Sequence, residues 1–366
     1  MRSFVLVIAV VLAGCSPRGE LAYGPLPEAR TLPVFVGSTR APAAGDPASF
    51  DWKRSEALRL ARFDVAVPPD HQPGTLEIPN PRRSIDPRRD FLVARSEQFR
   101  TDAAFRADLR RQLARSGGEA VVFVHGYNTN FAEGLFRFTQ LAADFDLEGA
   151  LVHYAWPSRA QVMGYAYDHD SVLFSRDGLT DLLHEVRAAG AKRIILVGHS
   201  MGGFLTMEAL RQLALQGDRA TLGRIAGVVL ISPDIDVGVF RSQARDIGAL
   251  PQPFIVFTSQ RDRALGLSAR VAGEDTRLGN LHDINPVADL RVMMIDTAAY
   301  DTRGGHFNIG NSPALIRLLR GSQGLAKTLE RDQSRHHDPF ARAALTVRNA
   351  TQIVLQPLEA IGDAIN

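Results

Sequence analysis

The chain has 366 residues, of which 45% are hydrophobic and 22% are charged, as in ordinary globular proteins. Its 42 basic and 40 acidic side chains leave a formal net charge of +2, too small an imbalance to indicate a nucleic-acid-binding protein. The length allows one large α/β domain with extensions or two average domains.

The first residues predict a secretory targeting segment over residues 1–14. A positive start at Met1-Arg2 is followed by an unbroken apolar run from Phe4 to Leu12. This run is shorter than the roughly 20 residues of a membrane-spanning helix and fits a signal peptide. The tetrad Leu12-Ala13-Gly14-Cys15 resembles the lipobox of bacterial lipoproteins. The alternative is an ordinary signal peptide that happens to contain a cysteine.

The lipobox resemblance implies that Cys15 becomes the lipidated N-terminus and anchors the protein in the bacterial cell envelope. Because Ser16 rather than aspartate follows Cys15, the same resemblance implies the outer membrane, with the protein facing the periplasm. Cys15 is the chain's only cysteine, which excludes an internal disulfide framework. Residues 15–33, rich in Pro, Gly and charge, predict a tether.

The next elements are short strands and one helix. Apolar or alternating segments predict strands at 32–37, 62–67, 75–78 and 91–93, and apolar residues on one face predict a helix over 103–115. From residue 119 the pattern alternates. Buried strands are expected at 120–124, 150–155, 193–197, 225–231, 254–258 and 290–295, with helices at 131–143, 171–189 and 203–215.

This alternation predicts an α/β fold with a mostly parallel sheet, covered by helices on both faces. The earlier strands are expected to extend one edge, so that residues 34–321 form one domain. Residues 322–366 are expected to be a polar linker followed by a C-terminal helical extension that docks on the body.

The strongest chemical signal is Gly198-His199-Ser200-Met201-Gly202, which lies directly between an apolar strand and a predicted helix. G-x-S-x-G in that context is the nucleophile elbow, in which a serine occupies a strained turn and glycines let the strand and helix approach. The alternative is a purely structural turn. A second signal, His125-Gly126-Tyr127-Asn128, also ends a predicted strand; its alternative is a strand-end turn with a packed histidine.

Together these pieces resemble the α/β-hydrolase superfamily and, within it, a family of uncharacterised bacterial esterases and lipases. The resemblance spans residues 34–320. It is carried by residues 34–40, His125-Gly126-Tyr127-Asn128, Trp156-Pro157-Ser158, Gly198–Gly203, Ser232-Pro233-Asp234-Ile235-Asp236 and Gly305-His306. It implies an α/β-hydrolase fold and an oxyanion hole made by the backbone N–H groups of Tyr127 and Met201.

The remaining triad members are expected in the order serine, acid, histidine. Asp262 follows the strand at 254–258 and is the favoured acid; Asp234 and Asp236, after the preceding strand, are the alternatives. His306 follows the last strand in a glycine-containing loop and is the favoured base. His282 precedes that strand, His199 is fixed by the turn, and His125 is expected to be structural.

The sequence therefore predicts a serine hydrolase that cleaves a carboxylic ester through an acyl-enzyme, with Ser200, His306 and Asp262 as the triad. Neither a cofactor nor a metal site is expected, and the partners are an ester substrate and, through Cys15, a membrane. One alternative is a non-catalytic scaffold or binding protein of the envelope on the same fold. Another is a lipase, thioesterase or peptidase with the same triad, because the fold hosts all of these.

Overall fold

A computed structural model describes residues 18–24, 29–44, 46–273, 276–302, 305–321 and 341–355. The predicted signal peptide and Cys15 lie outside the described residues, as does most of the predicted linker. No helix of the described part is long and apolar enough to cross a bilayer.

Within the described residues, eleven strands form one sheet in the order β10-β11-β9-β8-β7-β6-β4-β5-β1-β2-β3. The strands are β1 (Thr31–Ala43), β2 (Asp46–Ala66), β3 (Leu92–Gln98), β4 (Glu119–Val124), β5 (Ala150–Ala155), β6 (Arg193–His199), β7 (Ile225–Ile231), β8 (Phe254–Thr258), β9 (Met293–Asp296), β10 (Ala341–Val347) and β11 (Ala350–Leu355). The eight neighbouring strands from β11 through β9, β8, β7, β6, β4 and β5 to β1 are all parallel to one another. β10 at one edge of the sheet, and β2 and β3 at the other, pair in antiparallel orientation. The predicted mostly parallel sheet with extra N-terminal edge strands is thus confirmed.

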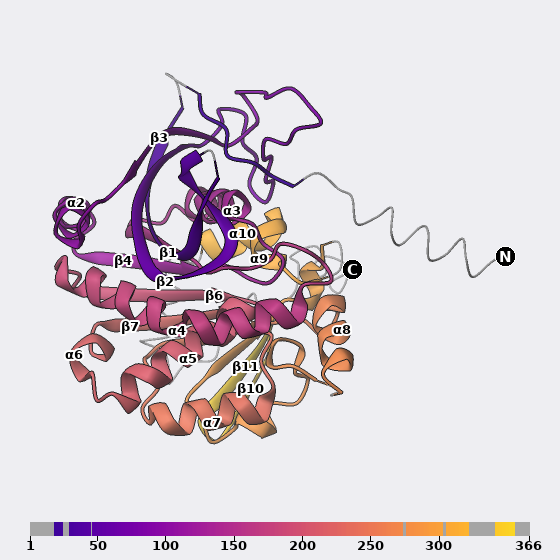
Figure 1. The fold of residues 1–366 in the computed structure, drawn as a ribbon. Coiled ribbons are helices and arrows are strands. Elements are labelled where there is room, and N and C mark those ends of the chain that lie inside the picture. The colour runs from indigo at the N-terminus through magenta and orange to yellow at the C-terminus, as the bar shows by residue number, and fades with distance from the viewer. Residues whose placement is uncertain are drawn as a thin grey trace.

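Helices cover both faces of this sheet (Figure 1). They are α2 (Asp102–Arg115), α3 (Phe131–Asp144), α4 (Tyr165–Ala188), α5 (Met201–Leu215), α6 (Arg219–Leu222), α7 (Val237–Ile247), α8 (Arg263–Val271), α9 (Asn308–Asn311) and α10 (Pro313–Gly321). Helices α4, α5 and α7 contribute to the core on one face of the sheet, and α3 and α10 contribute to the core on the other; in Figure 1, α4, α5 and α7 lie toward the viewer.

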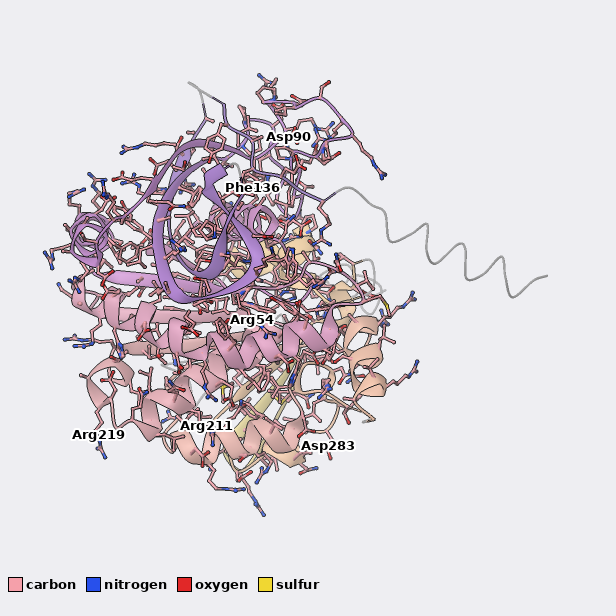
Figure 2. All side chains as sticks on the ribbon, in the orientation of Figure 1. Arg54, Asp90, Phe136, Arg211, Arg219 and Asp283 are labelled. Atoms are coloured by element: carbon pink, nitrogen blue, oxygen red, sulfur yellow. The ribbon has the colours of Figure 1, made fainter. Side chains whose placement is uncertain are left out.

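The strands read as continuous apolar runs because both of their faces are buried. Along β4, Val122 and Val124 belong to the core under α4 and α5, whereas Val121 and Phe123 belong to the core under α3. Figure 2 shows the result: Phe136 lies inside, while Arg219 and Asp283 point outward at the periphery.

The prediction of a free tether over residues 15–33 is wrong for the residues that the structure describes. Residues 18–24 pack on the body: the Val93 N–H donates to Ala22 O at 2.8 Å, and the Glu20 N–H donates to Pro79 O at 2.9 Å. From Thr31 the chain is already in β1. Composition predicts a free segment, but pairing with β3 supplies backbone hydrogen bonds that composition does not reveal.

The predicted C-terminal helical extension is wrong where the structure describes it, because residues 341–355 form the hairpin β10–β11. The turn is two residues long, with Arg348 at φ 53°. β-Branched side chains at Thr346, Val347, Thr351, Ile353 and Val354 favour strands over helices. β11 pairs in parallel with β9, so the domain extends beyond the predicted boundary at residue 321.

Candidate active site

Ser200 lies on a sharp turn between β6 and α5. It has φ 53° and ψ −125°, a region that a non-glycine residue occupies at a cost of about 1–3 kcal/mol. Its N–H donates to Ile231 O at 2.9 Å, and its carbonyl accepts from Gly203 N–H at 2.9 Å. The residue is 3% exposed. Neighbouring backbone therefore holds the serine in a strained position at the carboxyl end of a central strand.

Gly202 lets the first turn of α5 approach the end of β4. A Cβ on Gly202 would overlap with the carbonyl oxygens of Val124 and His125. Since these oxygens belong to backbone, no side-chain movement can relieve the overlap. The elbow therefore requires glycine here for close approach, not for a positive φ.

The loop after β4 lies against the serine. An ideal Cβ on Gly126 would lie 3.0 Å from Ser200 Cβ. Tyr127 follows in this loop, and Met201 is the first residue of α5; neither backbone N–H donates a hydrogen bond within the described chain. The helix N-terminus adds a partial positive charge at Met201. The two amides predicted for an oxyanion hole are thus unengaged beside Ser200.

Asp262 and His306 are hydrogen-bonded, with His306 Nδ1 and Asp262 Oδ2 2.8 Å apart. The other carboxylate oxygen caps α8 by accepting from Leu265 N–H at 3.0 Å. Gly305, at φ 77°, packs against the backbone of Arg261 and Asp262, where a Cβ would lie 3.0 Å from Arg261 O. That glycine therefore lets the histidine loop approach the acid loop.

The His306 ring lies beside the elbow, with its centroid 4.9 Å from that of His199. Among the described residues no hydrogen bond joins Ser200 Oγ to His306; in unliganded sites such bonds are often long and tighten when substrate binds. Because Nδ1 is engaged by Asp262, Nε2 is the ring nitrogen left to exchange a proton. Burial lowers the pKa of His199 well below its usual value, so that ring stays neutral.

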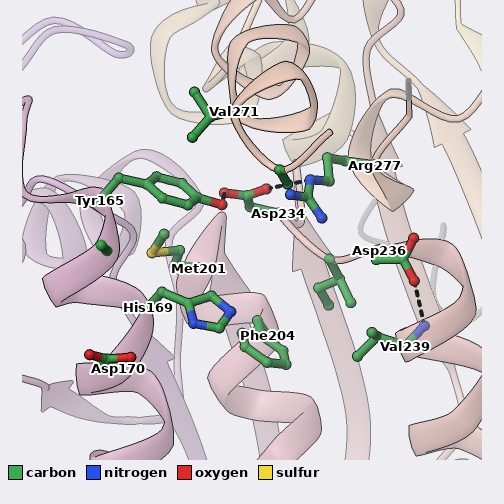
Figure 3. Close-up of a pocket in the computed structure, with 13 residues that line it drawn as sticks. Tyr165, His169, Asp170, Met201, Phe204, Asp234, Asp236, Val239, Val271 and Arg277 are labelled. Atoms are coloured by element: carbon green, nitrogen blue, oxygen red, sulfur yellow. Dashed lines mark hydrogen bonds and ion pairs between the residues drawn. The ribbon is translucent and has the colours of Figure 1, made fainter. Parts of the chain in front are cut away.

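The two alternative acids lie elsewhere. Asp234 accepts hydrogen bonds from the Tyr165 hydroxyl at 3.1 Å and from the Ser268 hydroxyl at 2.6 Å. It also forms an ion pair with Arg277, with Nε and Oδ1 3.3 Å apart. Asp236 caps α7 by accepting from Val239 N–H at 2.7 Å. Figure 3 shows both carboxylates engaged in this way, and neither is bonded to His306.

His125 is enclosed rather than poised for catalysis. It is 2% exposed, its ring stacks on Trp156 at an interplanar angle of 11°, and its nitrogens lie 2.9 Å from Gly126 O and 3.1 Å from Trp156 O. Burial lowers its pKa well below the usual value. The neutral ring therefore shapes the loop, as expected of a structural histidine.

A buried Arg40–Asp168 network beneath that loop is a feature the sequence analysis missed. Asp168 accepts from Ser158 Oγ at 2.6 Å and from Asn128 N–H at 3.1 Å. Arg40 donates to Thr129 O at 2.9 Å, and burial lowers its pKa to about 10. The network joins two motifs that are far apart in the sequence, residues 34–40 and Trp156-Pro157-Ser158. The presence of both motifs was the one sequence signal that could have indicated it.

A cavity of about 390 Å³ opens beside Met201, between α4, α5, α7 and α8. Its lining mixes apolar and polar side chains: Met201, Phe204, Ile235, Val239, Val271 and Ala272 are apolar, and Tyr165, His169, Asp170, Asp234, Asp236 and Arg277 are polar or charged (Figure 3). Burial raises the pKa of Tyr165 to about 12, so its hydroxyl stays protonated and donates to Asp234.

No metal-binding group of three or more His, Cys, Asp or Glu side chains occurs in the described part of the chain.

Comparison with known proteins identifies a family. Residues 101–298, more than half of the chain, match the model of a family described as alpha/beta hydrolase of unknown function (DUF900). Among curated proteins, none is significantly similar to the chain.

Solved structures similar to this one are distant in sequence. EstE1, a thermostable carboxylesterase cloned from a metagenomic library, is 13% identical with a TM-score of 0.34, over 88% of this chain and 92% of its own. A hydrolase of the alpha/beta superfamily from Xanthomonas campestris is 15% identical with a TM-score of 0.30, over 58% of this chain and 99% of its own. Lipase B of Aspergillus fumigatus is 15% identical with a TM-score of 0.29, and the match spans 40% of this chain and 38% of the lipase. The family assignment therefore rests on the sequence match to residues 101–298.

Proposed function

Because the chain belongs to this family of alpha/beta hydrolases, we propose that it is a serine hydrolase that cleaves a carboxylic ester through an acyl-enzyme. Ser200 is the nucleophile, His306 the general base and Asp262 the acid that orients the histidine. The observation that carries the proposal is the 2.8 Å contact between His306 Nδ1 and Asp262 Oδ2, next to a strained serine that follows a central strand.

The chemistry follows from these positions. His306 Nε2 takes the hydroxyl proton as Ser200 Oγ attacks the ester carbonyl, and the buried Asp262 carboxylate stabilises the imidazolium. The proton then passes to the departing alcohol. Water attacks the acyl-enzyme with the same base, which releases the acid and restores Ser200.

The developing oxyanion is assigned to the backbone N–H groups of Tyr127 and Met201. Both amides are unengaged in the described structure, so they need not break an existing hydrogen bond to bind an oxyanion. One donor of this kind lowers the barrier by about 3–4 kcal/mol. Strain at Ser200 and the packing of Gly126 on its Cβ are consistent with a preorganised site.

The cavity beside Met201 is assigned to the acyl chain. Met201 contributes its N–H to the proposed oxyanion hole and its side chain to the cavity wall, so a chain leaving the carbonyl carbon can enter directly. The apolar lining residues Phe204, Val239 and Val271 favour an aliphatic group. The carboxylates of Asp170, Asp234 and Asp236 in the same lining disfavour a free carboxylate on the acyl chain.

The test is hydrolysis of p-nitrophenyl esters of increasing acyl length by the full chain and by Ser200→Ala, together with labelling by a fluorophosphonate. We expect turnover and labelling by the unaltered protein and loss of both in the variant, with unchanged circular dichroism. Labelling that persists in Ser200→Ala would contradict the assigned nucleophile. Absence of both turnover and labelling in the unaltered protein would contradict a serine hydrolase.

The envelope location is also a proposal. Cys15 is taken as the lipidated N-terminus, and mass spectrometry of the mature protein tests it. The expected result is a diacylglyceryl-modified cysteine at the N-terminus, whereas a mature protein that begins elsewhere would contradict the anchor.

A further inference from the structure

Five exposed apolar side chains belong to the segments that border the cavity beside Met201. They are Met163 (95% exposed), Val162 (66%), Val271 (66%), Leu267 (61%) and Val239 (41%), which we call the apolar rim. Val239 and Val271 line the cavity, and so does Tyr165, two residues after Met163. Leu267 lies one turn before Val271 on α8, where it borders a second hollow together with Arg263 and Arg270. These five are half of the ten large hydrophobic residues that are exposed in the described chain, and a high share of exposed apolar residues in neighbouring segments is typical of an interaction surface.

Tyr127 binds the loop that carries the two rim residues Val162 and Met163. The Tyr127 hydroxyl donates to the backbone carbonyls of Gln161, at 3.3 Å, and of Val162. The Tyr127 ring also packs edge-on against Tyr165, with centroids 5.5 Å apart. The loop that carries Val162 and Met163 is therefore pinned by the residue whose N–H is assigned to the oxyanion hole.

Helix α8 carries two residues of the apolar rim and, next to them, two basic side chains. Its inner face buries Leu265 and Ala269, while Leu267 and Val271 are exposed. Arg263 and Arg270 are exposed beside them, and neither side chain forms an ion pair or hydrogen bond within the described residues. Exposed apolar residues flanked by arginines are typical of a helix at a lipid surface, because guanidinium groups bind phosphates well.

The N-terminal segment points to the same surface. Arg18 donates to Asn128 Oδ1 at 3.0 Å and to Asn128 O at 2.7 Å, so it is bound to the residue that follows Tyr127. Cys15 precedes Arg18 by three residues, which span at most about 11 Å. An anchor at Cys15 would therefore bring the bilayer to this side. In Figure 1 the first described residues and α8 lie toward the same side of the molecule.

We propose that the apolar rim docks on a phospholipid bilayer, with Arg263 and Arg270 on lipid phosphates, so that the cavity opens onto the membrane surface. Burial of the rim in the interface removes apolar area from water, which is the main driving force for such binding. Docking needs no ester hydrolysis and is therefore independent of the proposed chemistry.

The experiment uses the full chain with Cys15→Ser, which removes the single native cysteine. One new cysteine is introduced by Met163→Cys, Leu267→Cys or the control Leu215→Cys, and each is labelled with an environment-sensitive fluorophore. Leu215 is 63% exposed at the end of α5, so its exposure matches that of Leu267. Vesicles of phosphatidylcholine and phosphatidylglycerol, with and without brominated acyl chains, are then added. Binding through the N-terminal apolar run is common to all three proteins and does not distinguish them.

We expect a blue shift and bromolipid quenching for the probes at 163 and 267, but not for the probe at 215. Arg263→Gln with Arg270→Gln should raise the lipid concentration for half-maximal shift about fivefold per arginine. Unchanged fluorescence at 163 and 267, or an equal response at 215, would overturn the proposal. A blue shift at 163 that needs no vesicles and grows with protein concentration would assign the rim to a second copy instead.

Discussion

Tyr165 donates a hydrogen bond to Asp234, with its hydroxyl 3.1 Å from Oδ2, across the cavity beside Met201. This contact joins the first turn of α4 to the loop after β7. It engages a carboxylate that chain order alone leaves open as a triad acid. Ser268 and Arg277 bind the other oxygen of the same carboxylate. Asp234 is therefore part of the cavity wall, and Asp262 is left as the partner of His306.

Asp262→Asn and Asp234→Asn should separate these two roles. Asparagine keeps the cap on α8, because it caps as well as aspartate, but it cannot stabilise the imidazolium. We expect kcat for p-nitrophenyl acetate to fall on the order of 10⁴-fold in Asp262→Asn. In Asp234→Asn the change should appear mainly in KM and stay within about tenfold, because one hydrogen-bonded wall group contributes about 1 kcal/mol. Steady-state kinetics checks both, and a larger loss of kcat in Asp234→Asn would reverse the assignment.

Local motifs predicted most of the fold and the position of Ser200. A strand, a G-x-S-x-G turn and a helix are contiguous in sequence, so their geometry follows from neighbouring residues. Chain order also selected Asp262 and His306, which the structure places in contact across 44 residues. The two residues can meet because successive parallel strands end at one edge of the sheet, and their roles in catalysis stay a prediction.

What the sequence did not reveal depends on pairing between distant segments. The contact of Arg40 with Thr129 and that of Arg18 with Asn128 span 89 and 110 residues, and no local pattern encodes either. The sequence predicts helix for the β10–β11 hairpin because the Ala and Leu residues within 341–345 are strong helix formers. Backbone pairing with β9 stabilises β11 as a strand, and β9 lies more than 50 residues away in the sequence.

Gly202→Ala and Gly203→Ala should differ sharply although the residues are adjacent. A Cβ on Gly202 meets the backbone of Val124 and His125, whereas a Cβ on Gly203 meets the Pro233 side chain at 3.2 Å. We expect Gly202→Ala to displace the elbow from β4 and to lose ester hydrolysis and fluorophosphonate labelling. Gly203→Ala should retain labelling, with a loss of stability of about 1 kcal/mol. Equal labelling rates in the two variants would show that close approach at Gly202 is not required.

Phe204 should set the acyl-length preference. Its ring lines the cavity and stacks with His169, with centroids 5.6 Å apart. Phe204→Ala enlarges the cavity, so we expect the optimum of kcat/KM to shift to longer p-nitrophenyl esters, and Phe204→Trp should shift it to shorter ones. Acetate, which is too short to reach this wall, should change by less than about threefold. An unchanged chain-length profile in both variants would remove the cavity from acyl binding while leaving the triad assignment intact.

His153 should make folding sensitive to acid. It is fully buried beneath α3, and burial lowers its pKa to about 3, whereas an unfolded histidine has a pKa near 6.5. Below about pH 6.5 the unfolded chain therefore binds a proton that the folded chain does not, so stability falls as pH falls. Between pH 6.5 and 5.5 this one group should lower the free energy of unfolding by about 1 kcal/mol. Urea denaturation at the two pH values should show a correspondingly smaller loss in His153→Gln, and an equal loss would indicate that the buried ring does not titrate on unfolding.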